Sequence, residues 1–161
     1  MTFLPIDKED GKLIDAARET LRKAYLPHRH TVGAAVLCPS GRVYVGVNVE
    51  ACGYGPCAEP IAIGAAFTAG ERRLAKIVAV CKEGEEYPVL SPCGNCRQLV
   101  FDYSPDAIVI LDVDGDVVKT EARNLLPGAY ESGFDGQVGF ASPVVEQVDP
   151  GAGVIDYDDV V

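Results

Sequence analysis

The sequence lacks long apolar runs: charged residues or glycines interrupt every hydrophobic stretch well before the roughly 18 residues that a membrane-spanning helix needs. The N-terminal stretch has no basic segment followed by an apolar one, so no secretory signal is predicted. Basic residues are scarce, with 14 Lys and Arg against 24 Asp and Glu and a formal charge of −10. A polynucleotide needs a basic surface, so neither a nucleic-acid polymer nor a membrane is an expected partner. These absences favour a small-molecule substrate and a cytoplasmic location.

What the sequence does have is an ordinary globular composition. Its 161 residues suit a single domain, and 48% of them are hydrophobic. Acidic residues dominate the end of the chain, because no Lys or Arg follows Arg123. We therefore predict one domain over residues 1–130 and an acidic, glycine-rich C-terminal tail over residues 131–161.

The apolar pattern switches between helical and strand periods along the chain. A stripe with a period of 3.6 residues predicts the first helix, and short apolar runs bounded by turn residues predict strands. The predicted elements are a helix at 7–25, strands at 32–37 and 43–49, a helix at 57–69, a strand at 77–81, a helix at 93–103, strands at 107–111 and 117–118, and a short helix at 121–126. This order predicts an α/β domain of three layers, α/β/α, with a mixed five-stranded sheet.

Six cysteines leave two alternatives, disulfides or reduced thiols. The missing secretory signal and the adequate core favour reduced thiols, whose spacing then matters. Cys93 and Cys96 form a CxxC pair in the first turn of a predicted helix, so both thiols lie on one face, and Cys57 begins another helix. Helix N-termini stabilise the thiolate, which is the form that binds metal. A redox pair or two small buried residues are the alternatives for the CxxC pair.

Three thiolates with one open position are typical of a catalytic zinc site, because a structural site closes with a fourth protein ligand. The open position holds a water molecule whose pKa the metal lowers. Glu59, two residues after Cys57, is placed to accept a proton from that water and to return it. The alternative for Glu59 is a first-turn acid that interacts with the helix dipole. We predict one Zn²⁺ per chain, with Cys57, Cys93 and Cys96 as the ligands.

These motifs, with others across residues 10–130, resemble the cytidine deaminase family of the tri-cysteine zinc type. The matching segments are Cys57-Ala58-Glu59, Ser91-Pro92-Cys93-Gly94-Asn95-Cys96-Arg97-Gln98, Val32-Gly33-Ala34-Ala35, Gly46-Val47-Asn48-Val49-Glu50 and Leu125-Leu126-Pro127-Gly128-Ala129. The resemblance implies the cytidine-deaminase-like fold and a zinc ion on the three cysteines. It also implies a homotetramer, in which the last of these segments helps to shape a neighbouring active site.

The reaction implied by the resemblance is hydrolytic deamination of a free cytosine nucleoside, cytidine or deoxycytidine, to the uracil nucleoside and ammonia, a step of pyrimidine salvage. Glu59 is then the catalytic proton shuttle. The backbone N–H of Ala58 and the carbonyl of Ser91 contact the base. Asn48 and Glu50 match positions that bind the ribose hydroxyl, a role that an amide and a carboxylate suit. The alternative for this pair is a turn-capping amide beside an exposed carboxylate.

Three features depart from the family pattern. Pro60 stands where cytidine deaminases usually have an arginine, so Arg97 is our candidate for balancing the thiolate charge. The loop that ends at Cys57 is shorter than usual and resembles that of blasticidin S deaminases. His30 replaces a usual phenylalanine and is a candidate substrate-binding residue, by stacking or as an ionisable group. An exposed loop histidine is the alternative for His30.

Two other hypotheses stand beside the cytosine-nucleoside deaminase. One is a deaminase of blasticidin S or of another aminated heterocycle. The other, from a different class, is a non-catalytic zinc-binding module. A purely structural zinc would not need Glu59 and would recruit a fourth ligand. The sequence therefore favours an enzyme, a hydrolase that acts on the C–N bond of a cyclic amidine.

Overall fold

The computed structural model describes residues 2–131, and the rest of the predicted tail lies outside them. One compact unit extends to Ala129. Its elements are β1 (Leu4–Pro5), α1 (Lys8–Ala24), β2 (Val32–Leu37), β3 (Val43–Val47), α2 (Ala58–Thr68), β4 (Lys76–Cys81), β5 (Val89–Leu90), α3 (Gly94–Tyr103), β6 (Ile108–Val113), β7 (Asp116–Glu121) and the 3-10 helix η1 (Ala122–Leu125). None of the helices in residues 2–131 combines the length and the apolar character that crossing a bilayer requires.

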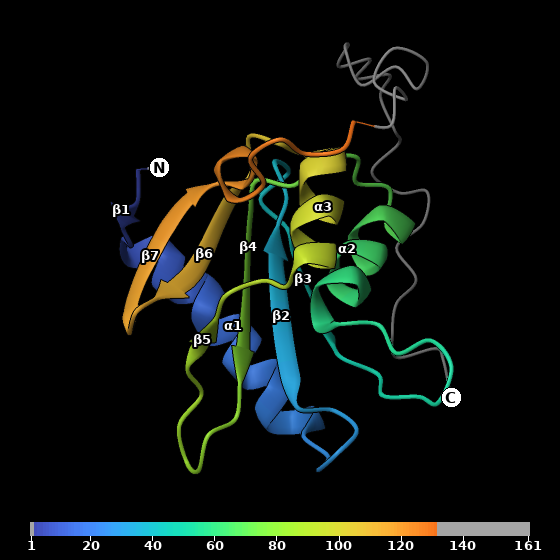
Figure 1. The fold of residues 1–161 in the computed structure, drawn as a ribbon. Coiled ribbons are helices and arrows are strands. Elements are labelled where there is room, and N and C mark those ends of the chain that lie inside the picture. The colour runs from blue at the N-terminus through green and yellow to red at the C-terminus, as the bar shows by residue number, and fades with distance from the viewer. Residues whose placement is uncertain (1, 132–161) are drawn as a thin grey trace. The chain divides into compact units, whose positions relative to one another are not determined.

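The strands form one mixed sheet in the order β1-β7-β6-β4-β2-β3, with β5 paired to β4 (Figure 1). The pair β4 and β6 is parallel, and the other pairs are antiparallel. The sheet has seven strands rather than the predicted five, because two more strands of two residues each join it: β1 pairs with β7 at one edge, and β5 pairs with the end of β4. The mixed α/β architecture itself is confirmed.

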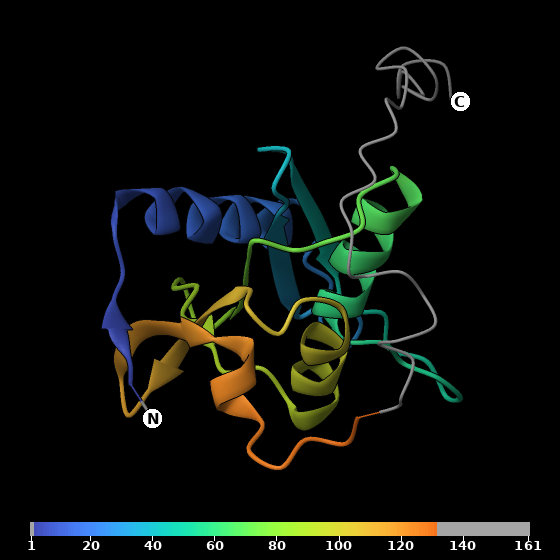
Figure 2. The ribbon, with the colours of Figure 1, turned by 90° about the horizontal axis from the view of Figure 1, so that it is seen from above.

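Helices cover both faces of the sheet, α1 on one side and α2 with α3 on the other (Figures 1 and 2). Alternate residues of β2 serve the two faces, since Ala34 and Val36 belong to the α2 and α3 side and Ala35 to the α1 side. On the α1 side, the buried stripe of the helix packs on β4 and β6 through Leu13, Ile14, Ala17, Leu21, Val78, Val80 and Ile110. The predicted three layers are therefore present.

Two glycines let these helices approach the sheet closely. A Cβ on Gly33 of β2 would lie 2.8 Å from the carbonyl oxygen of Ala17 in α1. A Cβ on Gly46 of β3 would lie 2.6 Å from the backbone nitrogen of Ala62 in α2. Real Cβ atoms do not come that near to backbone, so only glycine fits at either position. The glycines thus set how near each helix lies to the strands.

The start of α1 is tied to the sheet by a buried ionic cluster. Asp7 caps the helix and Asp10 completes the capping box. The Asp10 side chain is fully buried and accepts hydrogen bonds from Lys76 and Lys119, each at 2.5 Å. Burial raises the pKa of Asp10, but the hydrogen bonds from the two lysines outweigh it and hold the pKa below its ordinary value.

This cluster makes the fold sensitive to acid and to loss of the Asp10 charge. A pKa lowered by folding stabilises the native state above the unfolded-state pKa, near 4, and this contribution disappears as pH falls through the native-state pKa. Asp10→Asn leaves two lysines without their buried partner, and we expect it to cost about 3 kcal/mol of the free energy of unfolding at pH 7. Urea denaturation between pH 7 and pH 3 measures both effects.

The matched control for Asp10→Asn is Asp15→Asn on the same helix. Asp15 forms an exposed i,i+3 pair with Arg18, so its loss should change stability by less than about 0.5 kcal/mol. Equal stability losses for the two variants, or an unchanged pH slope in Asp10→Asn, would contradict the role assigned to the cluster.

Candidate metal centre

Three thiols from the ends of two helices converge on one point. Cys57 is the N-cap residue of α2, Cys93 is the N-cap residue of α3, and Cys96 lies in the first turn of α3. The Sγ atom of Cys93 lies 3.8 Å from that of Cys57 and 3.5 Å from that of Cys96. All three Sγ atoms lie within 4.8 Å of one another. A disulfide has sulfurs about 2.05 Å apart, so these thiols are reduced, as predicted.

The geometry of the thiols fits zinc. A tetrahedral zinc with Zn–S bonds of about 2.3 Å requires sulfurs about 3.8 Å apart, close to the separations found here. Within residues 2–131, the group that could hold a metal contains these three cysteines and no further His, Asp or Glu. The centre is therefore a three-thiolate zinc site of the kind that keeps one position for a non-protein ligand.

The three thiols differ in their readiness to ionise. Burial raises the pKa of Cys93, but the nearby backbone N–H groups of Cys96 and Asn95 and the neighbouring thiols outweigh it, and the pKa is lowered. Burial raises the pKa of Cys57 and, more strongly, that of Cys96. Full ionisation of the trio therefore needs a bound cation in addition to the two helix N-termini.

Glu59 lies beside this centre in the first turn of α2. Its side chain is only 6% exposed, although no cation pairs with it among the described residues. Burial raises the pKa of Cys96, and the negative charge of Glu59 raises it further. Glu59 and Cys96 also line the same pocket. A buried carboxylate next to a metal centre is suited to accepting and releasing a proton.

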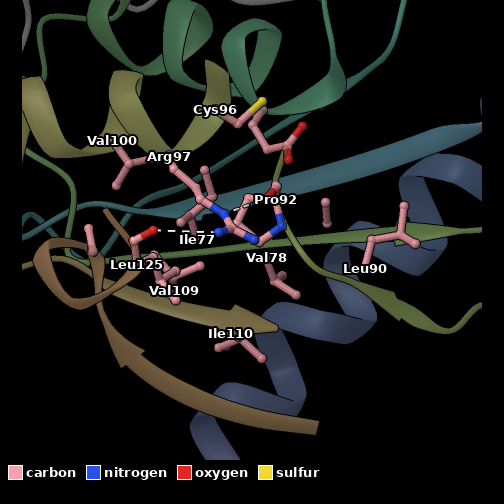
Figure 3. A pocket seen from close by; sticks show the side chains of 13 residues that line it. Ile77, Val78, Leu90, Pro92, Cys96, Arg97, Val100, Val109, Ile110 and Leu125 are labelled. Carbon is pink, nitrogen blue, oxygen red and sulfur yellow. Dashed lines mark hydrogen bonds between the residues drawn. The ribbon is translucent and has the colours of Figure 1, made fainter. Parts of the chain in front are cut away.

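Arg97 does not contact the sulfurs. Its Nε donates to the carbonyl of Pro92 at 2.9 Å, and its Nη1 donates to the carbonyl of Leu125 at 3.5 Å (Figure 3). No arginine or lysine in the described part of the chain donates to a ligand thiol. The direct charge-balancing contact suggested for Arg97 is therefore absent from this structure.

A second polar group brings together three of the predicted substrate-binding residues. The buried Asn48 side chain accepts hydrogen bonds from the backbone N–H groups of Thr31, at 2.7 Å, and Val32, at 2.9 Å. Its Nδ2 donates to Oε1 of Glu50 at 3.1 Å, and Nδ1 of His30 lies 2.8 Å from the main-chain carbonyl oxygen of Asn48. Asn48 thus fixes the positions of both neighbours.

A backbone hydrogen bond joins the two ends of the loop between this polar group and the thiols. The backbone N–H of Val49 donates to the carbonyl of Pro56 at 3.1 Å, directly before Cys57. The segment after β3 that carries Asn48 and Glu50 therefore lies next to the first metal ligand, although eight residues separate Asn48 from Cys57. Cys52 lies exposed in this loop and is outside the thiol group.

Ala58 and Ser91, the residues whose main chain is predicted to contact the base, lie next to the thiols in the chain. Ala58 is buried at the first position of α2, where its N–H is one of the unpaired donors of the helix start. Ser91 is exposed ahead of Cys93, and its Oγ donates to the carbonyl of Asp112 at the end of β6.

Sequence reasoning missed two residues that hold this site together. Asp112 anchors Ser91 through its main-chain carbonyl, and the side chain of Arg29 donates to the carbonyl of Glu50 at 3.1 Å. Both contacts use a backbone oxygen, which every residue carries, so the residue types gave no signal for them.

Comparisons with known proteins agree with this geometry. A family model described as the cytidine and deoxycytidylate deaminase zinc-binding region matches residues 7–112. The blasticidin-S deaminase of Bacillus cereus is 36% identical over 137 residues, covering 81% of this chain and 98% of the relative. A cytidine deaminase of Halalkalibacterium halodurans is 37% identical over 123 residues, covering 73% of this chain and 91% of the relative.

A comparison with solved structures also finds cytidine deaminases. The crystal structure of cytidine deaminase from Burkholderia pseudomallei matches with a TM-score of 0.63 at 36% identity, covering 78% of this chain and 100% of that chain. The family match spans all three thiols and Glu59.

Proposed function

Because the chain belongs to the cytidine and deoxycytidylate deaminase family and is a zinc hydrolase that acts on C–N bonds, we propose that it deaminates free cytosine nucleosides. Cytidine or deoxycytidine becomes the uracil nucleoside, and ammonia leaves. The observation that carries this proposal is the Asn48–Glu50 pair, which follows β3 next to the metal centre. The buried Asn48 amide holds the exposed Glu50 carboxylate in place, where it can accept a hydrogen bond from a sugar hydroxyl. A substrate panel tests the proposal, as described below.

In the proposed reaction a water molecule adds to C4 of the cytosine ring, and the bond from C4 to the exocyclic nitrogen breaks. Zinc, when held by the three thiolates, supplies the Lewis acidity that activates this water. Glu59 accepts one proton of the water and delivers it to the ring nitrogen N3, where it stays in the product. It then moves the second proton, from the new hydroxyl on C4, to the amino group, which departs as ammonia while C4 becomes a carbonyl. Its burial beside Cys96 supports this role, because a dry carboxylate exchanges protons with the substrate rather than with bulk water.

We propose that main-chain groups orient the base. The N–H of Ala58, unpaired at the start of α2, donates to the ring, and the carbonyl of Ser91 accepts from the exocyclic amino group. The hydrogen bond from Ser91 Oγ to Asp112 supports a fixed position for that carbonyl. The Ser91 contact disfavours a ring that carries a carbonyl in place of the amino group, because two carbonyl oxygens cannot hydrogen-bond to each other.

His30 is proposed to contact the substrate by its ring. Since a carbonyl oxygen only accepts hydrogen bonds, Nδ1 of His30 is the donor to Asn48, and the neutral ring then carries its lone pair on Nε2. An imidazole held in this way offers a flat face for stacking and an acceptor for a hydroxyl or an amine.

Glu50 is proposed to bind the ribose, so its removal should discriminate between substrates with and without a sugar. Glu50→Ala removes a charged hydrogen-bond acceptor, which is worth about 1.5–3 kcal/mol. We expect kcat/KM for cytidine to fall roughly 10- to 100-fold, while kcat/KM for free cytosine stays within twofold of the parent value. Ammonia release or the change in ultraviolet absorbance measures both.

The matched control for Glu50→Ala is Glu19→Ala on α1, whose carboxylate pairs with Arg22 and Lys23 at the surface. It should leave both substrates unaffected. Equal losses on cytidine and cytosine in Glu50→Ala would show that Glu50 does not hold a sugar.

A second candidate substrate is blasticidin S. One observation favours it: the match to the Bacillus cereus blasticidin-S deaminase extends over 98% of that relative. A panel of cytidine, deoxycytidine, cytosine, blasticidin S and aminopurines separates the candidates by kcat/KM. A zinc-loaded protein inactive on the whole panel would instead support the non-catalytic zinc-binding module.

We further propose that the enzyme is a cytoplasmic homotetramer of pyrimidine salvage. Three free thiol ligands support a reducing compartment, in which thiols persist. Exposed apolar side chains on the edge strand β3, Val43 and Val45, and on α2, Ile61, support burial against other copies.

A further inference from the structure

Arg97 makes an unusual pair of contacts for a charged side chain next to a metal ligand. It follows Cys96 in α3 but turns back under the helix start, where it meets the carbonyls of Pro92 and Leu125 (Figure 3). No carboxylate pairs with its guanidinium among the described residues, although the group is half-buried. Two of its five N–H donors therefore bind main-chain oxygens from different segments.

The surroundings of Arg97 strengthen these contacts. The pocket under α3 is lined mainly by apolar side chains of the sheet and the helix, among them Ile77, Val100, Val109 and Leu125 (Figure 3). Because these side chains offer no competing polar groups, a hydrogen bond from a charged donor is stronger here than at a fully exposed surface.

The carbonyl of Pro92 belongs to the segment that presents Cys93. Pro92 is buried, and Ser91 before it is anchored on the other side through its Oγ to the carbonyl of Asp112. The segment 91–93 is thus held between β6 and Arg97. It carries one metal ligand and the carbonyl proposed to accept from the substrate amino group.

We propose that Arg97 is a positioning residue of the zinc centre, which locks segment 91–93 and ties it to η1 through Leu125. The role assigned to the Ser91 carbonyl rests on the proposed function, whereas the metal-holding role does not. Arginine is needed because its planar, rigid fork reaches both carbonyls at once. A lysine at the same place carries one nitrogen and serves one of them.

The test compares Arg97→Gln and Arg97→Lys with the parent enzyme, each loaded with zinc. The rate of zinc release to a chromogenic chelator is measured without any substrate. Loss of a residue that orients a metal ligand typically costs 10- to 100-fold in metal affinity. We expect Arg97→Gln to release zinc at least about tenfold faster, with Arg97→Lys in between.

Cobalt substitution supplies a second readout. The visible absorption bands of a cobalt–thiolate centre report ligand geometry, and we expect them to shift or broaden in Arg97→Gln. A residue with a merely structural role would lower the melting temperature of the metal-free and metal-loaded proteins alike and leave these bands unchanged.

The matched control is Arg123→Gln in η1, where the arginine is exposed and pairs with Glu121. It should release zinc at the parental rate. Zinc release and cobalt spectra in Arg97→Lys and Arg97→Gln equal to those of the control would overturn the proposal. Because neither measurement uses a substrate, this outcome is distinct from a failure of the proposed deaminase activity.

Discussion

Glu59→Gln is expected to abolish most turnover while leaving zinc and fold in place. The amide cannot accept a proton from water or deliver one to the ring, and a positioned acid–base group contributes roughly 10²–10⁴-fold to a rate. Glutamine has nearly the same size, so the buried position in the first turn of α2 stays filled. Steady-state kinetics on the best substrate of the panel, with zinc content from atomic absorption, measure the effect.

Glu85→Gln is the control for this result, because Glu85 is exposed in the loop before β5. It should retain parental kcat and one zinc per chain. A purified Glu59→Gln enzyme with full zinc and parental kcat would refute the proton-transfer role. A loss of zinc together with activity would instead make Glu59 part of the metal-holding structure.

Removal of a metal-ligand thiol has the second largest expected effect. Cys96→Ser replaces a thiolate by a hydroxyl that stays protonated at neutral pH, so two of three ligands remain. We expect zinc affinity to fall by more than about 100-fold, beyond the usual cost of losing an outer-shell partner, and turnover to fall with it. Cys93→Ser tests the same idea at an exposed position, without a hydroxyl placed in the core.

A cysteine outside the centre separates ligand loss from general thiol effects. Cys81 lies on β4 and its Sγ contacts Glu83 rather than the trio. Cys81→Ser should keep one zinc per chain and parental activity. If either ligand variant bound zinc as tightly as Cys81→Ser, the three-thiolate site would be wrong.

Most elements of the fold could be predicted because each carries its own local pattern. The bounds predicted for β2, residues 32–37, are those observed, since a continuous buried run has clear ends. β3 ends at Val47 rather than 49, because the N–H of Val49 bonds to Pro56 in the loop instead of to a strand. The two-residue strands β1 and β5 were missed because only their pairing with β7 and β4 defines them.

The candidate site, like the fold, could be predicted from the sequence only in part. The three thiols were predictable because their residue types and their places at two helix starts restrict the chemistry. The partners of Arg97 were not, because both are main-chain carbonyls brought near by the fold. The Asn48 side chain also proved to be engaged with Thr31 and Val32 as well as with Glu50, which no spacing rule indicates.

Gly46, on β3, sets the distance between the segment that carries Asn48 and Glu50 and the helix start that carries Cys57 and Glu59. Gly46 lies two positions before Asn48 and packs against α2, which has Cys57 as its N-cap residue and Glu59 in its first turn. One added methyl group would push α2 outward, and Cys57 and Glu59 would shift away from Asn48 and Glu50 and relative to the two thiols on α3. Position 46 therefore tolerates few substitutions although it lies away from the proposed reacting atoms. Gly46→Ala, a small change, is expected to lower activity as a change in the site itself would.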